Sequence, residues 1–375
     1  MKHHTTSPRL LAGLALVAAT SLVLSACGGS SGEAGGSSSG GSSSGGGGGD
    51  PLAVTLITKT STNPFFIAMQ QGAEAAGKEN NVKITTAAGK EDGDEATQIQ
   101  AIEAAMARGD DGILITPATD GVNPAIQQAR DAGLYVIALD TPPNPPDTVD
   151  ITFATDNFKA GELIGKWAAG TLNGKKATIA LLDLFNDKIA SVDYNRDQGF
   201  LTGMGIDTKN KEKNGDEDPT GTYTGGKGGD YEIVCNEPTN GAQDKGRTAM
   251  ETCLNSSKDI NLVYTINEPA AVGAAEALDA ARLKDVTIVS VDGGCSPGIE
   301  AVKDGTIGAT SQQYPVKMAQ LGVEAIAKFK ATGEKPAVTP GLDFFDTGVA
   351  LVTDKPVDGV DSITVAEAEK ICWGK

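Results

Sequence analysis

Short apolar runs alternate with amphipathic stretches along the chain after residue 50. The runs AVTLIT, VKITTA and GILIT are followed by stretches of helical period at about 64–78, 94–108 and 123–133, and LYVIALD is followed by a proline-rich loop at 142–146. Each run is apolar almost continuously, which is typical of strands in a parallel sheet that helices cover on both faces. This half of the chain therefore predicts a β-α array.

The same pattern restarts after ITFATDN. Helices are expected at 161–172 and 193–204, a strand at 176–184, and further strands in YEIVC, NLVYTIN, VTIVSVD and GTIGATS. The stretch 207–230 is rich in Gly and charged residues and is expected to be an exposed excursion. Two successive arrays predict an α/β protein with two doubly wound parallel-sheet lobes, joined by several close strand crossings.

The first 49 residues have a different composition. Lys2 and Arg9 precede an apolar run at 10–24, which is too short to cross a bilayer and ends in Leu-Ser-Ala-Cys. This layout is typical of an export signal. The end resembles the lipobox of bacterial lipoproteins, so we expect a signal at 1–26 and an acylated Cys27 that begins a flexible Gly/Ser tether at 27–49. Ordinary signal cleavage is the alternative.

Composition excludes several classes of function. Both histidines, His3 and His4, lie in the expected signal, so the mature protein would have no Ser-His-Asp or Cys-His catalytic system and no His-dependent metal site. The net charge of −18 becomes −20 without Lys2 and Arg9. A surface this acidic favours solubility and disfavours binding to nucleic acid.

Four cysteines follow Cys27, namely Cys235, Cys253, Cys295 and Cys372. An even number in an exported chain favours two disulfides, with three possible pairings, and buried free thiols are the alternative. Cys235 ends a predicted strand and Cys253 lies on the next helix, so we expect them to form a local bridge that closes about 18 residues. A bridge from Cys295 to Cys372 would pin the C-terminal tail near the hinge.

Polar side chains gather where the predicted strands end. Ligands of doubly wound sheets bind beyond the carboxyl ends of the strands. Any one of these residues could cap a helix or close a turn instead. Their presence at corresponding places indicates a binding site formed by Lys59, Asn63, Asp140, Asn267, Asp292 and Gln313.

The stretches TNPFF, ALDT, FATDN, NRDQGF, TINEP, VSVDGG and ATSQQYP, in this order, resemble the sugar-binding proteins of bacterial ABC importers. The resemblance is to the ribose-type branch with the type I periplasmic-binding fold, covers about 52–352, and is closest to the fructose-binding subgroup. It implies a multi-strand hinge between an N-terminal lobe and a C-terminal lobe. We expect the first lobe at 50–155 with 314–345 and the second at 156–313 with 346–375.

The resemblance also implies roles for individual residues. Carried over motif by motif, the resemblance implies that Asn63, Phe65 and Phe66 contact the sugar. Asp140 would accept hydrogen bonds from the sugar hydroxyls and Arg196 would donate to them. The pocket would be completed by Asn267, Asp292 and Gln313. Two positions depart from the ribose-type pattern. Thr141 stands where those proteins have an Arg, and Asn240 where they have an aromatic residue, which argues against ribose as the main ligand.

The expected pocket suits a neutral sugar. A phenylalanine ring can cover the C–H face of a sugar while planar polar groups bind its hydroxyls, so one of the two adjacent rings is expected in the pocket and the other in the core. The charges of Lys59 and Arg196 balance those of Asp140 and Asp292, which disfavours an anion. A ketose would use the space left by the two departures, so we expect fructose.

The expected partners are an ABC permease and its ATPase, with a monomeric binding protein, no cofactor, no metal and no membrane contact beyond the lipid anchor. One alternative is a sugar sensor that docks to a membrane receptor. The other is a glycoside hydrolase with Asp140 and Asp292 as its acid and base.

Overall fold

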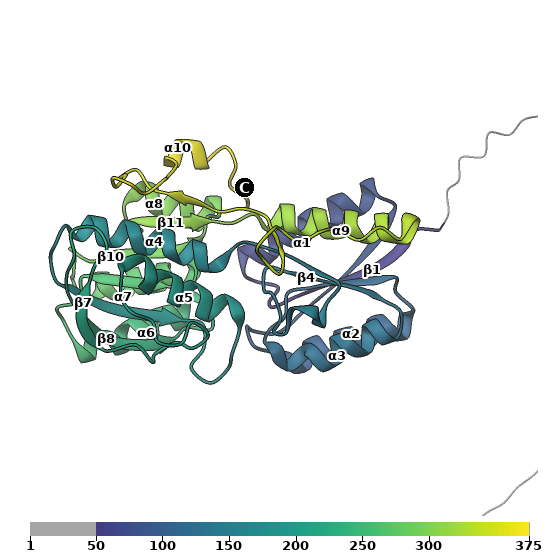
Figure 1. Ribbon diagram of the computed structural model, residues 1–375, viewed down its shortest axis with the longest axis horizontal. Helices are drawn as coiled ribbons and strands as arrows, with labels where there is room; N and C mark the ends of the chain where they lie inside the picture. The colour runs from purple at the N-terminus through teal and green to yellow at the C-terminus, as the bar shows by residue number, and fades with distance from the viewer. Residues whose placement is uncertain (1–49, 375) are drawn as a thin grey trace, which may run out of the picture. The chain divides into compact units, whose positions relative to one another are not determined.

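The computed structural model describes residues 50–374, and the expected signal, Cys27 and the tether lie outside this range. Two separate β-sheets, each covered by helices on both faces, form the predicted α/β architecture (Figure 1). We call each sheet with its helices a lobe. No helix within residues 50–374 is both long and apolar enough to cross a membrane.

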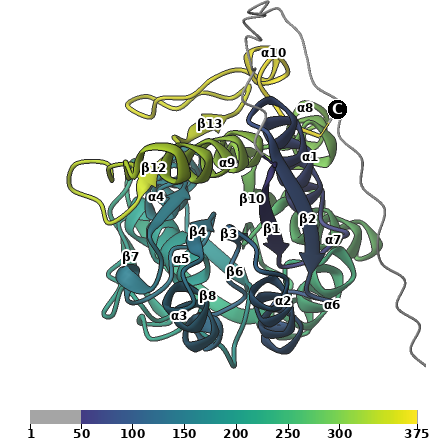
Figure 2. The same ribbon diagram turned by 90° about the vertical axis from the view of Figure 1, so that its right-hand side faces the viewer.

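The first lobe is built on a six-stranded parallel sheet in the order β12-β5-β4-β3-β1-β2. Its strands are β1 Leu52–Thr58, β2 Val82–Ala88, β3 Gly112–Ile115, β4 Tyr135–Leu139, β5 Ile151–Ala154 and β12 Phe345–Asp346. Its helices are α1 Pro64–Glu79, α2 Glu95–Arg108, α3 Asn123–Asp131 and α9 Pro315–Thr332, with short turns at Asp120–Val122 and Pro146–Thr148. Helices α1 and α9 cover one face and α2 and α3 the other, which explains the continuous apolar runs (Figure 2).

The second lobe is built on a seven-stranded sheet in the order β13-β11-β10-β9-β6-β8-β7. Its strands are β6 Ala177–Asp183, β7 Thr220–Tyr223, β8 Gly229–Pro238, β9 Leu262–Thr265, β10 Thr287–Asp292, β11 Ala309–Gln312 and β13 Ala350–Val352. Its helices are α4 Asn157–Leu172, α5 Ser191–Met204, α6 Gln243–Ser256, α7 Glu268–Ala280, α8 Glu300–Asp304 and α10 Val365–Ala368, with a π-turn at Cys295–Ile299. Helices α4 and α5 pack on one face, and α6, α7 and α8 on the other.

The structure corrects two expectations about this lobe. The stretch 207–230 is not wholly an exposed excursion, because β7 pairs antiparallel with β8 and the side chain of Tyr223 is buried. Helix α4 begins at Asn157, four residues before the expected start, because the carboxylate of Asp156 accepts a hydrogen bond from the backbone N–H of Lys159 and caps it.

The described chain passes three times between the two sheets, from β5 to α4, from β11 to α9 and from β12 to β13. These crossings place the carboxyl ends of the parallel strands of both sheets opposite each other. Two disulfides lie in the second lobe, Cys235–Cys253 with an S–S distance of 1.98 Å and Cys295–Cys372 with 1.97 Å. They join the same cysteines that the sequence analysis pairs.

Candidate functional site

A small cavity lies where the carboxyl ends of the two sheets face each other. Its volume is about 30 Å³, room for about two water molecules. The lobes also touch directly beside it, because Lys188 Nζ donates to the Gly93 carbonyl at 2.9 Å and Ser191 Oγ to the Pro142 carbonyl at 2.5 Å. The cavity is lined by Lys59, Asn63, Phe65, Phe66, Asp92, Asp140, Leu184, Val192, Arg196, Ile266, Asn267 and Asp292.

Arg196 lies at the centre of the polar part of this wall and is 5% exposed. Its Nε donates to Asn157 Oδ1 at 2.7 Å and its Nη1 to the Ile266 carbonyl at 2.8 Å, which fixes the plane of the guanidinium. Nη1 lies 3.6 Å from Asp292 Oδ1, and Nη2 lies 3.7 Å from Asp140 Oδ1. One buried cation therefore faces a carboxylate from each lobe.

Asp140 has a second cationic neighbour. Lys59 Nζ lies 3.8 Å from Asp140 Oδ2, and both side chains are almost fully buried. Thr141 Oγ1 donates to the same carboxylate oxygen at 2.8 Å. In the second lobe Gln313 Nε2 donates to Asp292 Oδ1 at 2.9 Å. Neither Thr141 nor Gln313 lines the cavity, so the structure places them behind the two carboxylates, where they hold them in position.

Asn63 and Asn267 serve as helix caps and also line the cavity. Asn63 Oδ1 accepts from the backbone N–H of Phe65 at 2.9 Å and begins α1. Asn267 Oδ1 accepts from the backbone N–H of Ala270 at 3.1 Å and begins α7, while its Nδ2 donates to the Gly241 carbonyl at 3.0 Å. Each of these side chains therefore caps a helix and also forms part of the cavity wall.

Both phenylalanines line the cavity, rather than one ring there and one in the core. Phe65 and Phe66 meet edge to face, with ring centroids 5.4 Å apart and planes at 88°. Both side chains are buried and also pack into the core of the first lobe. The perpendicular arrangement lets neighbouring helical residues contribute to one wall.

Asn240 does not line the cavity. It lies at a wider opening of about 830 Å³ beside it, together with Lys90, Glu91 and Gly241. Its backbone adopts a positive φ of 48°, and its N–H donates to the Leu184 carbonyl at 2.9 Å. The opening shares Asn63 and Asp92 with the cavity wall, so Asn240 lies at the entrance to the cavity.

Asp92 is a site residue that the sequence reasoning missed. It follows β2 as Lys59 follows β1, and it is 6% exposed. Burial raises the pKa of its carboxyl to about 6, with a smaller contribution from the charge of Asp140 and an opposing one from Lys59. Burial likewise raises the pKa of Asp292 to about 7, against the opposing charge of Arg196. With a pKa of about 6, the Asp92 carboxyl is mostly ionised at pH 7 and adds negative charge beside the cavity.

Two acceptor oxygens of residues that line the cavity are buried without a hydrogen-bond partner: Asp92 Oδ1 and Asp140 Oδ1. Such groups are costly to bury unless a donor reaches them. The hydroxyls of a polyol are suitable donors. Among residues 50–374, no group of three or more His, Cys, Asp or Glu side chains is arranged to hold a metal ion.

The raised pKa of Asp92 predicts a pH dependence of stability. A folded pKa of about 6 lies above the ordinary 3.8, so the folded state binds this proton more tightly than the unfolded state. The resulting stabilisation is fully present below about pH 4 and is lost as the pH rises through 6. The parent should lose about 2 kcal/mol of unfolding free energy through this group between pH 4 and pH 7, and Asp92→Asn should remove that part of the loss. Urea titrations of ligand-free protein at the two pH values measure the difference.

Asp94 offers a matched control in the same loop. Hydrogen bonds from Thr97 and Lys90 lower its pKa to about 2, so its contribution is lost only as the pH falls below 4. Asp94→Asn should leave the change between pH 4 and pH 7 as it is in the parent. If the unfolding free energy of Asp92→Asn changed between pH 4 and pH 7 as much as that of the parent, the buried position of Asp92 would be wrong.

Comparison with known proteins identifies the family. A model of the periplasmic binding protein domain matches residues 54–335. The chain is 26% identical to the ribose import binding protein of Bacillus subtilis over 72% of this chain and 79% of that protein. It is 28% identical to a galactofuranose-binding protein of Escherichia coli over 76% and 84%.

Among solved structures, an ABC transporter solute-binding protein from Agrobacterium vitis with bound D-fucose aligns with a TM-score of 0.69. The two chains are 25% identical, and the alignment covers 85% of this chain and 99% of that one. The domain match and the two-lobe α/β fold agree with each other. The chain therefore belongs to the family of the periplasmic binding protein domain.

Proposed function

We propose that this protein is the sugar-binding component of an ABC importer and that it captures a monosaccharide between its two lobes. The observation that carries the proposal is the convergence of Asp140 and Asp292, from opposite lobes, on the guanidinium of Arg196. Charged groups form short, strong hydrogen bonds with hydroxyls, and the two phenylalanine rings supply an apolar wall for the C–H face of a sugar.

The similar proteins support this class of ligand. The relatives are named for ribose import and galactofuranose binding, and the Agrobacterium vitis protein holds D-fucose. All three are binding proteins and all three ligands are neutral sugars. These relationships favour reversible binding over hydrolysis and delivery of the sugar to a permease with its ATPase.

Sugar binding would be coupled to motion of the lobes. The cavity of about 30 Å³ is too small for a sugar ring, so the lobes must separate to admit one. A sugar that contacts carboxylates of both lobes then stabilises the closed state by its differential contacts. A monomer anchored through Cys27 would carry out this cycle on the outer face of the cytoplasmic membrane. Cys27 lies outside the described residues.

Fructose is the sugar we assign. Thr141 holds Asp140 where ribose-type proteins carry an Arg, and Asn240 lies at the entrance where they carry an aromatic residue. Both side chains are smaller than those they replace, and we assign the space left beside Asp140 and at the entrance to the extra hydroxymethyl group of a ketose. The near balance of cationic and acidic side chains around the cavity favours an uncharged ligand.

Titration calorimetry of ligand-free protein tests this assignment against fructose, ribose, glucose and galactose, with an amino acid mixture as control. Fructose should bind most tightly, by at least about tenfold, which is about 1.4 kcal/mol. A preference for ribose would refute the assignment to fructose and leave the class intact. Absence of binding to every monosaccharide, or binding of an amino acid, would refute the class.

A further inference from the structure

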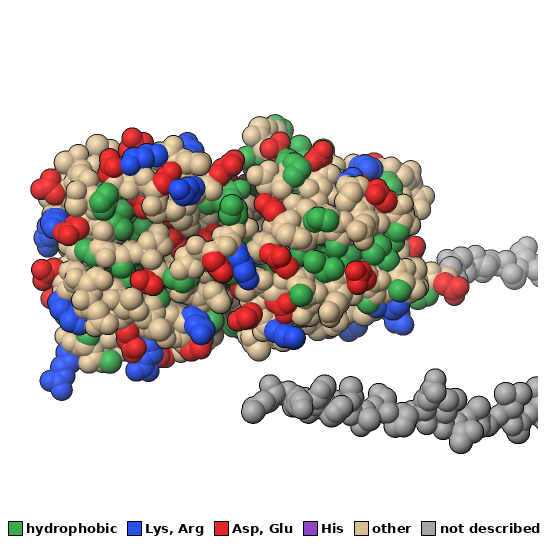
Figure 3. Space-filling model, turned by 90° about the horizontal axis from the view of Figure 1, so that it is seen from below, with side chains coloured by type: hydrophobic (Ala, Val, Ile, Leu, Met, Phe, Trp, Pro, Cys, Tyr) green, Lys and Arg blue, Asp and Glu red, His purple; other side chains and the backbone are tan. Residues whose placement is uncertain are grey.

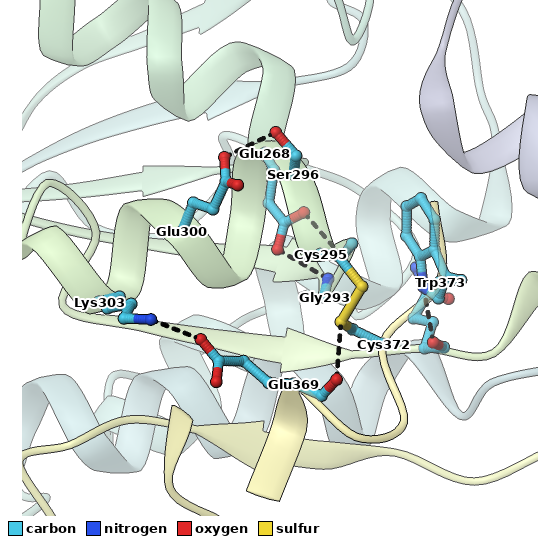
Figure 4. The surroundings of a disulfide bond; sticks show 11 residues. Glu268, Gly293, Cys295, Ser296, Glu300, Lys303, Glu369, Cys372 and Trp373 are labelled. Atoms are coloured by element: carbon cyan, nitrogen blue, oxygen red, sulfur yellow. Dashed lines mark hydrogen bonds and ion pairs between the residues drawn. A yellow bond between two sulfur atoms is a disulfide. The ribbon is translucent and has the colours of Figure 1, made fainter. Parts of the chain in front are cut away.

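The C-terminal tail reaches the binding site. Beyond α10 the chain continues to Cys372, which is bonded to Cys295, and to Trp373, which is 7% exposed (Figure 4). The backbone carbonyl of Trp373 accepts from the N–H of Cys295 at 2.8 Å, and its indole Nε1 donates to the Gln313 carbonyl at 3.0 Å. The last turn of the tail is therefore built into the second lobe rather than lying on its surface.

The indole ring also contacts the first lobe. Its centroid lies 5.4 Å from that of Phe65, with the ring planes at 87°. Phe65 meets Phe66 in the same edge-to-face manner, so the three rings form a continuous series that ends in the cavity wall. Because rotamers of packed aromatic rings are coupled, Trp373 limits the positions that Phe65 can take.

On its other side, Trp373 packs on the loop that carries Asp292. A Cβ atom added to Gly294 would lie 2.9 Å from the indole ring, so the ring lies directly against this backbone. The buried carboxylate of Glu268 accepts from the N–H groups of Gly293 at 2.7 Å and Gly294 at 3.1 Å. Glu268 from within and Trp373 from outside thus hold the segment between Asp292 and the disulfide.

Upstream of Ile371 the tail is held by α10, whose Val365 and Ala368 side chains are buried in the core of the second lobe. The last residues have weaker side-chain contacts of their own. Helix α10 has four residues, Ile371 is 50% exposed, and the ion pair between Lys303 and Glu369 at 2.7 Å joins two side chains that are about half exposed. Exposed ion pairs of this kind contribute little and are screened by salt. The disulfide and the burial of Trp373 are therefore the attachments that keep the ring against Phe65.

From these contacts we infer that the tail is a disulfide-fastened strut and that Trp373 is a positioning residue for sugar binding, acting through Phe65 and the Asp292 loop. The ligand in this inference depends on the proposed function, whereas the contacts of the tail do not. Opening the Cys295–Cys372 bond frees the tail, so Phe65 and Asp292 are no longer held in advance for the sugar, and affinity falls. Reduction of this one disulfide would then lower sugar capture.

The two disulfides provide a matched pair of variants. Cys295→Ala/Cys372→Ala opens the strut. Cys235→Ala/Cys253→Ala opens the bridge between β8 and α6, whose cysteines pack in a different core from the one that holds Phe65 and Trp373. We expect fructose affinity to fall at least about tenfold in the first variant and less than about twofold in the second. Equal losses would assign the effect to general destabilisation and overturn the inference.

Variants at position 373 test the ring itself. Trp373→Ala should weaken binding as the open strut does, and Trp373→Phe, which keeps an aromatic ring against Phe65, should recover most of the affinity. If both variants bind as the parent does, the strut has no role in binding and the inference fails.

Hydrogen exchange separates this inference from the proposed function. Removing the Cys295–Cys372 bond should raise amide exchange at least about tenfold in 63–69 and 292–296, and removing the other disulfide should not. This result is independent of any sugar. If the parent binds no monosaccharide, the proposed function fails while the exchange data still test the strut. Unchanged exchange in these segments would overturn the strut.

Discussion

Replacing Arg196 with methionine should weaken sugar binding by about 2–5 kcal/mol, roughly 30- to 5,000-fold, because truncating one partner of a buried charge pair leaves the others unpaired. The guanidinium is the shared partner of Asp140, Asp292, Asn157 and the Ile266 carbonyl. The free energy of unfolding should fall by about 3–5 kcal/mol for the same reason. Calorimetric titration and urea unfolding measure the two effects separately.

Arg247→Met is the control for this substitution. Arg247 pairs with Glu251 at 3.0 Å on the surface of α6, and both side chains are about half exposed. Arg247 lines the wide opening beside the cavity but not the cavity itself, so it is a control for stability only. Its loss should change the unfolding free energy by less than about 0.5 kcal/mol. If Arg196→Met were no more destabilising than Arg247→Met, the central position of Arg196 in the charge network would be wrong.

Sequence patterns predict most of this fold because its strands are buried on both sides. Continuous apolar runs such as β4 and β6 arise from helices on both faces of a sheet, and every residue of these two strands is buried. The polar residues that follow the runs then gather at the carboxyl edge of each sheet by topology alone. For this reason the sequence alone predicts that Asp140, Asn267 and Asp292 belong to one binding site.

Asp92 could not be singled out in the same way. It lies in the loop GKEDGDE, where Glu91 is exposed at the entrance to the cavity and Asp94 caps α2 by accepting from the N–H of Thr97 at 3.1 Å. Three acidic residues within four positions have three different environments. Only the approach of the second lobe, whose Gly241 lies against Asp92, distinguishes the buried one.

The strand β7 and the tail show two other limits. In β7 only Tyr223 is buried, so the strand has no apolar run, and it forms because β8 offers an edge for antiparallel pairing. Trp373 meets Phe65 from the opposite end of the chain. No local pattern encodes that contact, because it depends on the lobes and the disulfide being in place.

The close packing of α4 on α5 leads to a second substitution with a large expected effect. Glycines on both helices let the backbones approach. A Cβ atom added to Gly161 would lie 2.1 Å from the backbone oxygen of Arg196, and one added to Gly199 would lie 2.2 Å from that of Phe158. These contacts are with backbone atoms, which cannot rotate away, so an added methyl group must push the helices apart.

Gly161→Ala should therefore lower the unfolding free energy by about 3 kcal/mol, although alanine is the better helix former by about 1 kcal/mol. The displaced segment of α5 carries Arg196 itself. Because the guanidinium must reach Asp140 in one lobe and Asp292 in the other, affinity for the sugar should fall at least about tenfold. Urea unfolding and calorimetric titration of the same preparation measure both quantities.

Gly170→Ala, on the same helix, is the control that tests whether contact with the α5 backbone causes the effect of Gly161→Ala. Its added Cβ would lie 2.2 Å from Cγ1 of Val357, a side-chain atom that can move by rotation of χ1, and not from α5. The gain in helix propensity offsets much of the cost there, so stability should change by less than about 1 kcal/mol and affinity should stay at the parent value. A Gly161→Ala protein that retained the parent affinity would show that α5 can shift without moving the guanidinium, and that the Asn157 and Ile266 contacts alone fix Arg196.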